Sequence, residues 1–109
     1  MKKIILLAGI FSLAAAMTAA AADGKALWGQ HCAMCHGADG KGQTNMGKRL
    51  GIKDYSDPKI QAALTDEAAT KAIKDGFKTP EGKTVMRPLK NLSDAEVNSL
   101  VAYMRTLKK

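Results

Sequence analysis

Apolar residues recur at helical intervals in the last part of the chain. The five that share one face of a helix are Val97, Leu100, Val101, Met104 and Leu107. Ser93 precedes this run, and Glu96 stands three positions after Ser93, which is the pattern of a capping box at a helix N-terminus. We therefore predict a C-terminal helix that begins after Ser93 and buries this apolar face.

Weaker patterns of the same kind predict three more helices. They are expected over residues 24–36, 58–64 and 65–76. Pro58 suits the first turn of its helix, Thr65 can cap the next one, and Gly76 stands where that helix would end. No stretch alternates apolar and polar residues as a strand does. The predicted fold class is therefore all-α, with long loops at 37–55 and 77–92.

The N-terminal segment has a different pattern. Two lysines precede an apolar stretch over residues 4–17, and alanines at 20–22 follow it. This three-part pattern is typical of a secretory signal peptide. An uncleaved anchor helix is the alternative, but the strongly apolar stretch is shorter than the roughly 20 residues that a membrane span needs. We predict a signal peptide at residues 1–22, one domain at 23–109, and an exported, periplasmic protein with no stable membrane insertion after cleavage.

The composition of the predicted domain differs from that of the whole chain. Residues 1–22 contain 17 apolar residues, whereas the other 87 contain 33 and only four aromatic side chains. A domain of this size with so few large apolar groups commonly depends on a cofactor, a metal or a disulfide. The net charge of +7 falls to +5 without the two N-terminal lysines. Something besides side chains is therefore expected to fill the core.

The motif Cys32-Ala33-Met34-Cys35-His36 carries the clearest chemistry. C-x-x-C-H is the attachment pattern of c-type haem. Two thiols at this spacing can add to the two vinyl groups of one porphyrin, and the imidazole that follows can bind its iron. We therefore predict that Cys32 and Cys35 hold a covalent haem and that His36 is an axial iron ligand.

Three other interpretations fit the motif less well. A thioredoxin-type redox pair expects a βαβ setting, which the pattern lacks. A zinc site would need four ligands, and His31, Cys32, Cys35 and His36 are crowded into six residues. A disulfide would suit an exported protein but would leave the small core unexplained. Haem supplies a large apolar body, so the sequence favours haem.

The chain resembles the small monohaem class I cytochromes c of exported bacterial electron-transfer chains over residues 23–109. The motifs that carry the resemblance are Gly24–Trp28, Cys32–His36, Gly37–Gly42, Met86–Pro88, Leu92–Glu96 and Leu100–Arg105. The resemblance implies a cytochrome c-like fold with a haem-centred core, in which the N- and C-terminal helices cross. Gly24 and Tyr103 match the small residue and the aromatic residue that meet at that crossing.

A methionine is expected as the second axial ligand, because a His/Met pair raises the reduction potential and suits electron transfer. The resemblance points to Met86, in the loop before the last helix. Met46 is the reserve, although it has a tight reach only ten residues after the motif histidine. Met34 lies between the cysteines and is expected to point away, and Met104 belongs to the apolar face of the last helix.

One position departs from the family pattern. Many members have a proline in the loop after the haem motif, and its backbone carbonyl orients the axial imidazole. Lys48 stands at that position here. We expect its carbonyl to remain available for the same hydrogen bond. Tyr55 is a candidate donor to a haem propionate, with simple packing as the alternative.

Basic residues gather in the loops expected around the haem. They are Lys41, Lys48, Arg49, Lys53, Lys83 and Arg87. A basic ring there would steer redox partner proteins with acidic docking surfaces, and a merely solvated lysine-rich surface is the alternative. Nucleic acid binding fits poorly, because the charge is scattered and aromatic residues are few.

These observations together predict a soluble one-electron carrier that contains haem c and iron and is not an enzyme. One alternative is a haem enzyme or a gas- or peroxide-binding domain whose sixth coordination position is open. Another is a fixed haem subunit of a larger oxidoreductase. The three differ in whether the second axial ligand is bound and in whether the protein acts alone.

Overall fold

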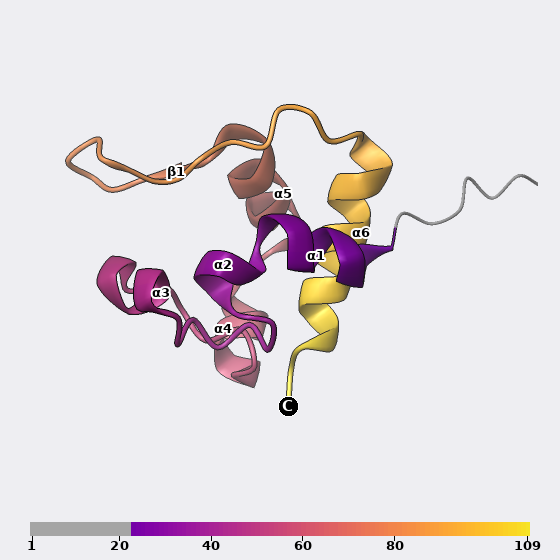
Figure 1. The fold of residues 1–109 in the computed structure, drawn as a ribbon, viewed down its shortest axis with the longest axis horizontal. Helices are drawn as coiled ribbons and strands as arrows, with labels where there is room; N and C mark the ends of the chain where they lie inside the picture. Colours follow the sequence, from indigo (N-terminus) through magenta and orange to yellow (C-terminus); the bar gives the residue numbers. More distant parts are fainter. Residues whose placement is uncertain (1–22) are drawn as a thin grey trace, which may run out of the picture.

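The computed structural model describes residues 23–109, so the predicted signal peptide lies outside the described residues. This part of the chain is mostly helical, as predicted. Its elements in chain order are α1 Gly24–His31, α2 Ala33–His36, α3 Asn45–Leu50, α4 Pro58–Ala63, α5 Asp66–Asp75, β1 Phe77–Lys78, β2 Thr84–Met86 and α6 Asp94–Thr106. Figure 1 shows α1 and α2 across the middle of the view, with α5 above them, α4 below them and α6 to the right.

The C-terminal helix α6 has the predicted cap and the predicted buried face. The Glu96 backbone N–H donates to Ser93 Oγ at 3.1 Å, and the Ser93 N–H donates to Glu96 Oε1 at 3.0 Å. These reciprocal bonds satisfy donors that a helix N-terminus otherwise leaves free. The buried apolar cluster of the domain consists of Trp28, Cys32, Ala69, Ile73, Val97, Leu100, Val101 and Met104. The core is therefore as small as the composition predicted.

The helices α1 and α6 cross at Gly24 (Figure 1). A Cβ atom on Gly24 would lie 2.5 Å from the Ser99 carbonyl oxygen and 2.9 Å from Tyr103 Cβ. Beside this contact, the rings of Trp28 and Tyr103 lie 5.9 Å apart between centroids. The absence of a side chain at Gly24 therefore lets the two helix backbones meet, and the predicted crossing is confirmed.

We expect Gly24→Ala to lower the free energy of unfolding of the holoprotein by about 1–3 kcal/mol, the usual cost of overpacking. Gly29→Ala is the matched control in the same helix, because nothing lies within 4 Å of its added Cβ. The control should stabilise the helix by about 0.5–1 kcal/mol. Denaturant titration of both variants measures the difference. Equal midpoints would show that the crossing has room for a side chain.

The long loops predicted at 37–55 and 77–92 both contain short regular elements. In the first, α3 begins after Thr44, whose Oγ1 accepts from the Gly47 N–H at 2.8 Å and donates to the Cys35 carbonyl at 2.6 Å. In the second, β1 and β2 form an antiparallel hairpin. The expectation of no strand was therefore wrong, because strands of two and three residues are too short for any alternation to show.

The first predicted helix, residues 24–36, is divided at Cys32. The backbone of Cys32 has φ −118° and ψ −35°, and it separates α1 from α2. The turn remains tightly bonded, because the His36 N–H donates to the Cys32 carbonyl at 2.9 Å. No helix within residues 23–109 has both the length and the apolar character to cross a membrane.

Candidate functional site

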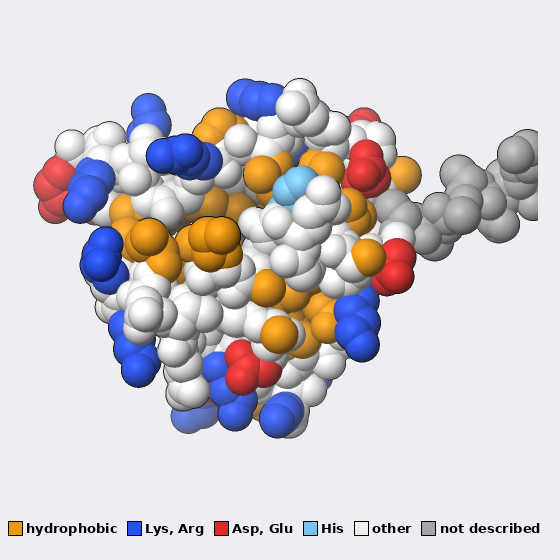
Figure 2. Space-filling view, in the orientation of Figure 1, with side chains coloured by type: hydrophobic (Ala, Val, Ile, Leu, Met, Phe, Trp, Pro, Cys, Tyr) orange, Lys and Arg blue, Asp and Glu red, His pale blue; other side chains and the backbone are white. Residues whose placement is uncertain are grey.

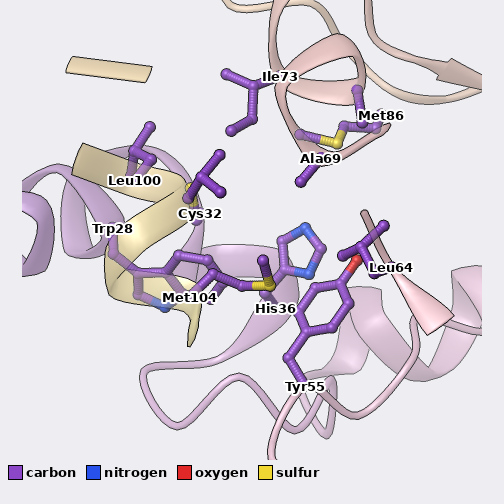
Figure 3. A pocket seen from close by; sticks show the side chains of 12 residues that line it. Trp28, Cys32, His36, Tyr55, Leu64, Ala69, Ile73, Met86, Leu100 and Met104 are labelled. Carbon is purple, nitrogen blue, oxygen red and sulfur yellow. The ribbon is translucent and has the colours of Figure 1, made fainter. Parts of the chain in front are cut away.

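An apolar cavity lies at the centre of the described domain, between the α1–α2 turn, the Tyr55 loop, α5 and α6. Its empty volume is about 470 Å³, including the part open to solvent. Cys32, His36 and Met86 line the cavity together with aliphatic side chains of α5 and α6 (Figure 3). The structure thus brings three of the four predicted site residues to one space.

The fourth residue, Cys35, is half-buried on α2 and is not among the residues that line the cavity. Its N–H donates to the Cys32 carbonyl at 3.2 Å, so both cysteines belong to one turn. Both thiols are free, in contrast to the disulfide alternative. Burial, together with the neighbouring Cys35, raises the pKa of the Cys32 thiol to about 11, so Cys32 stays protonated at neutral pH.

The imidazole of His36 lies between two aromatic rings. Its centroid is 5.5 Å from that of Trp28, and it stacks on Tyr55 at 5.4 Å with an interplanar angle of 26°. Trp28 is held in place because its Nε1–H donates to the Gly37 carbonyl at 2.8 Å. Burial lowers the pKa of His36 and so favours the neutral imidazole, which is the form that binds a metal.

The Nδ1 atom of His36 is buried and has no hydrogen-bond partner among the described residues. The expected hydrogen bond from this ring to the Lys48 carbonyl is therefore wrong for this structure, and the contacts with Trp28 and Tyr55 orient the ring instead. Buried polar atoms without a partner are uncommon in proteins. Nδ1 is the nitrogen that the expected carbonyl bond would satisfy, and a neutral imidazole at an apolar cavity fits a residue whose other ring nitrogen binds a cofactor metal.

The four methionines of the domain differ in their surroundings. Met86 lies on β2, is half-buried and lines the cavity. Met104 also lines the cavity, but it is 4% exposed within the apolar face of α6. Met34 and Met46 are 84% and 38% exposed, and neither lines the cavity. The structure thus brings Met86 to the same space as His36 and leaves Met46 outside it.

Comparison with known proteins identifies the family. Residues 21–108 match the profile of the family described as cytochrome c. The chain belongs to the cytochrome c family. Members of this family are haem-based electron carriers, and the chain therefore binds haem c, with its iron, covalently.

Relatives of this cytochrome c come from bacteria. The chain is 36% identical to cytochrome c-553 of Nitratidesulfovibrio vulgaris, with 98% of this chain and 100% of the relative covered. It is 30% identical to cytochrome c-554(547) of Halothiobacillus neapolitanus, with 81% and 97% covered. The solved structure of the c-type cytochrome KustC0563 has a TM-score of 0.69 and 41% identity, covering 80% of this chain and 99% of that one. The cytochrome c fold is thereby shown.

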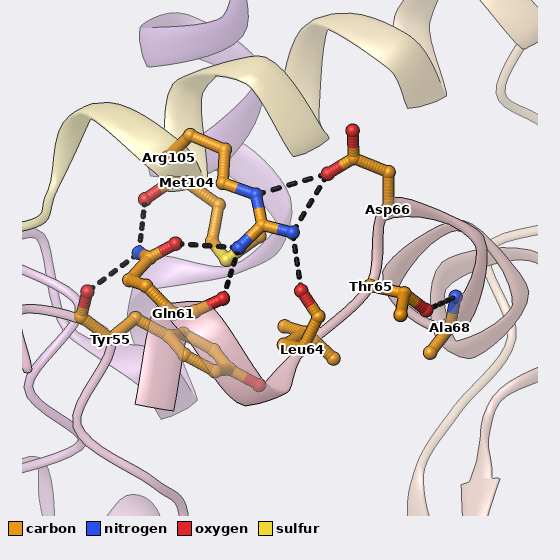
Figure 4. Close-up of polar contacts among 8 residues, drawn as sticks. All are labelled: Tyr55, Gln61, Leu64, Thr65, Asp66, Ala68, Met104 and Arg105. Carbon is orange, nitrogen blue, oxygen red and sulfur yellow. Dashed lines mark hydrogen bonds and ion pairs between the residues drawn. The ribbon is translucent and has the colours of Figure 1, made fainter. Parts of the chain in front are cut away.

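One wall of the cytochrome c cavity is held by a pair of polar residues that sequence reasoning missed. Gln61 is 5% exposed, and its Nε2 donates to the carbonyls of Tyr55 at 2.7 Å and Met104 at 2.9 Å. Arg105 donates from Nη1 to the Gln61 side-chain and main-chain oxygens, and from Nη2 to the Leu64 carbonyl (Figure 4). Tyr55, Leu64 and Met104 all line the cavity.

No local sequence pattern predicts the contact between Gln61 and Arg105, because the two residues are 44 positions apart. Arg105 also forms an ion pair with Asp66 at the start of α5. A charge near the end of a helix usually indicates only favourable contact with the helix dipole. Here the planar guanidinium bonds several acceptors at once, which is the geometry that distinguishes arginine from lysine.

We expect Arg105→Ala to lower the free energy of unfolding of the holoprotein by about 1–3 kcal/mol, because half-buried carbonyl groups lose their donors. The control is Arg49→Ala, which removes an exposed arginine from α3 and should change the free energy by less than about 0.5 kcal/mol. Denaturant midpoints of the two holoproteins test this. A shift of equal size in both variants would contradict the role of the Gln61–Arg105 pair.

Proposed function

We propose that this cytochrome c is a soluble one-electron carrier with His36 and Met86 as axial iron ligands of a haem attached through Cys32 and Cys35. The observation that carries the proposal is that His36 and Met86 line one apolar cavity together with Cys32. A haem with both axial positions filled has no open site for a substrate, so the protein is not an enzyme. A His/Met pair also favours a high reduction potential.

The chain has distinct tasks in this proposal. The haem supplies reversible one-electron exchange at its iron when bound. The two thiols fix it to the chain, and the neutral imidazole of His36 supplies a nitrogen donor without first losing a proton. The thioether of Met86 would supply the second donor to the iron. Aliphatic side chains of α5 and α6 exclude water from the cavity, which lowers the local dielectric constant.

The distribution of charge on the surface supports the proposal that redox partner proteins with acidic docking surfaces bind this protein. In Figure 2, Lys and Arg side chains lie to the left of and above exposed hydrophobic side chains over α2, α3 and the β1–β2 hairpin, with an acidic side chain at the hairpin tip. Five of the six basic residues considered in the sequence are exposed: Lys48, Arg49, Lys53, Lys83 and Arg87; Lys41 is half-buried. Met34, Met46 and Phe77 are exposed hydrophobic residues. Positive charge around an apolar contact accelerates encounter with an acidic partner.

Export belongs to the same proposal. Residues 1–22 act as a signal peptide, and residues 23–109 form the periplasmic protein. Support comes from the three-part N-terminal pattern and from a family match that begins at residue 21. Mass spectrometry of the protein from the producing cell checks this, because cleavage gives a chain that begins near Asp23. An intact N-terminus on the mature protein would contradict it.

The function is tested by adding carbon monoxide to the reduced holoprotein at neutral pH. We expect the visible spectrum to stay unchanged, because Met86 fills the sixth position. Rapid and complete binding would instead favour the haem enzyme or gas-binding alternative. Size exclusion of a native extract addresses the fixed-subunit alternative, since a free carrier elutes near its own small mass.

A further inference from the structure

Gly76 lies directly beneath the segment that carries Met86. It follows α5 with φ +77° and ψ −177°. A Cβ atom at this position would lie 2.5 Å from the Met86 carbonyl oxygen and 3.0 Å from both Cδ and N of Pro88. Real Cβ atoms essentially never approach another heavy atom as closely as the first of these distances. The main chain from Met86 to Pro88 therefore packs directly against the backbone of Gly76, with no side chain between them.

This segment is anchored on both sides of the contact. Phe77, next to Gly76, pairs with Met86 across the β1–β2 hairpin. Beyond Pro88, the Leu89 N–H donates to the Ile73 carbonyl in α5 at 2.8 Å. Ile73 itself is buried and lines the haem cavity. Because both ends of the 86–89 segment are bonded, a side chain on Gly76 would have to displace this segment as a whole, Met86 included.

We infer that Gly76 is a positioning residue for Met86: its missing side chain lets the Met86–Pro88 segment lie against α5 with the Met86 side chain at the cavity. The inference rests on the proposed ligation by Met86. Figure 3 shows Met86 beside Ala69 and near Ile73, two α5 residues that line the same cavity. A methyl group at residue 76 moves the Met86 backbone away from α5 and so weakens the bond of its thioether to the iron.

The hairpin itself offers a matched control. Gly82 has φ +83°, nearly the same left-handed angle as Gly76, but nothing lies within 4 Å of its added Cβ. Alanine at either position meets the same kind of backbone strain, because L-residues rarely adopt positive φ. Only alanine at residue 76 also meets the Met86 segment. A difference in imidazole affinity between the two variants is therefore due to the contact with the Met86 segment and not to the backbone strain.

The experiment titrates the oxidised holoproteins of Gly76→Ala, Gly82→Ala and the wild type with free imidazole, which competes with Met86 for the iron. We expect imidazole to bind Gly76→Ala about tenfold or more tightly than the wild type, because overpacking weakens the bond that imidazole must break. The long-wavelength absorption of the sulfur-ligated oxidised protein should also diminish. Gly82→Ala should match the wild type in both measurements.

Equal imidazole affinity in Gly76→Ala and Gly82→Ala would overturn the inference. Met86→Ala, titrated in parallel, separates this outcome from failure of the proposed function. If imidazole affinity does not rise in Met86→Ala, Met86 is not the ligand. If it rises there but not in Gly76→Ala, only the role of Gly76 is wrong.

Pro88→Ala provides a second variant should Gly76→Ala yield no folded holoprotein. The proline ring rests against the Gly76 position and stiffens the segment after Met86. Replacing it should raise imidazole affinity in the same direction by a smaller factor. If Pro88→Ala binds imidazole no more tightly than the wild type, the packing of this segment against Gly76 does not hold Met86 in place, and the inference is overturned.

Discussion

Replacing both Cys32 and Cys35 by alanine is expected to give a chain that neither retains haem covalently nor folds stably. The reason lies in the size of the core. Within residues 23–109, only eight buried apolar residues form it, around a solvent-open cavity lined mostly by apolar side chains. Domains this small seldom hold together on side-chain burial alone. We expect the double variant to lose most of the far-ultraviolet helical signal of the wild type.

Acidic extraction of haem from the purified proteins measures attachment, and circular dichroism measures folding. Met34→Ala is the control inside the same motif, because Met34 lies between the cysteines and is 84% exposed. It should keep its haem through extraction and retain the wild-type helical signal. Wild-type helical content in the double cysteine variant would show that the chain forms its core without the cofactor.

Met86→Ala is expected to open the sixth coordination position. The oxidised protein should lose the long-wavelength absorption of sulfur ligation, and the reduced protein should bind carbon monoxide. The reduction potential should fall, because a methionine ligand raises the potential of haem iron. Visible spectroscopy and redox titration of the holoprotein measure all three changes.

Two other methionines serve as controls for Met86. Met46→Ala alters a residue on α3 that is 38% exposed and lies outside the cavity, so the spectrum should not change. Met104→Leu replaces a core residue at nearly constant volume and should also keep the band. If the band survives in Met86→Ala and disappears in Met46→Ala, the reserve candidate is the ligand.

Elements with strong local signals could be predicted from the sequence. The capping box of Ser93 and Glu96 and the apolar face after it predicted α6, and both are present. Cys32, His36 and Met86 were singled out by their motifs and lie at one cavity. These features depend on neighbouring residues or on chemistry that only a few side chains provide.

Features that depend on distant contacts could not be predicted. The strands β1 and β2 are too short to show a pattern, and α3 is stabilised by the bond from Thr44 to Cys35. The Gln61–Arg105 pair joins α4 to α6 across 44 positions. The prediction of a hydrogen bond from His36 to the Lys48 carbonyl was wrong for a similar reason. Whether a loop carbonyl points at a ring is decided by packing that no local pattern records.

The crossing at Gly24 has a consequence for the order of events when the protein folds. It joins the first helix of the domain to the last, so nearly the whole chain must be available before the contact can form. Such distant contacts form late, because a long loop has to close first. The turn from Cys32 to His36 follows α1 directly, and its hydrogen bonds join neighbouring residues, so it can form without α6. An exported chain in which α6 has not yet docked can therefore receive its haem before the last helix closes over the cavity.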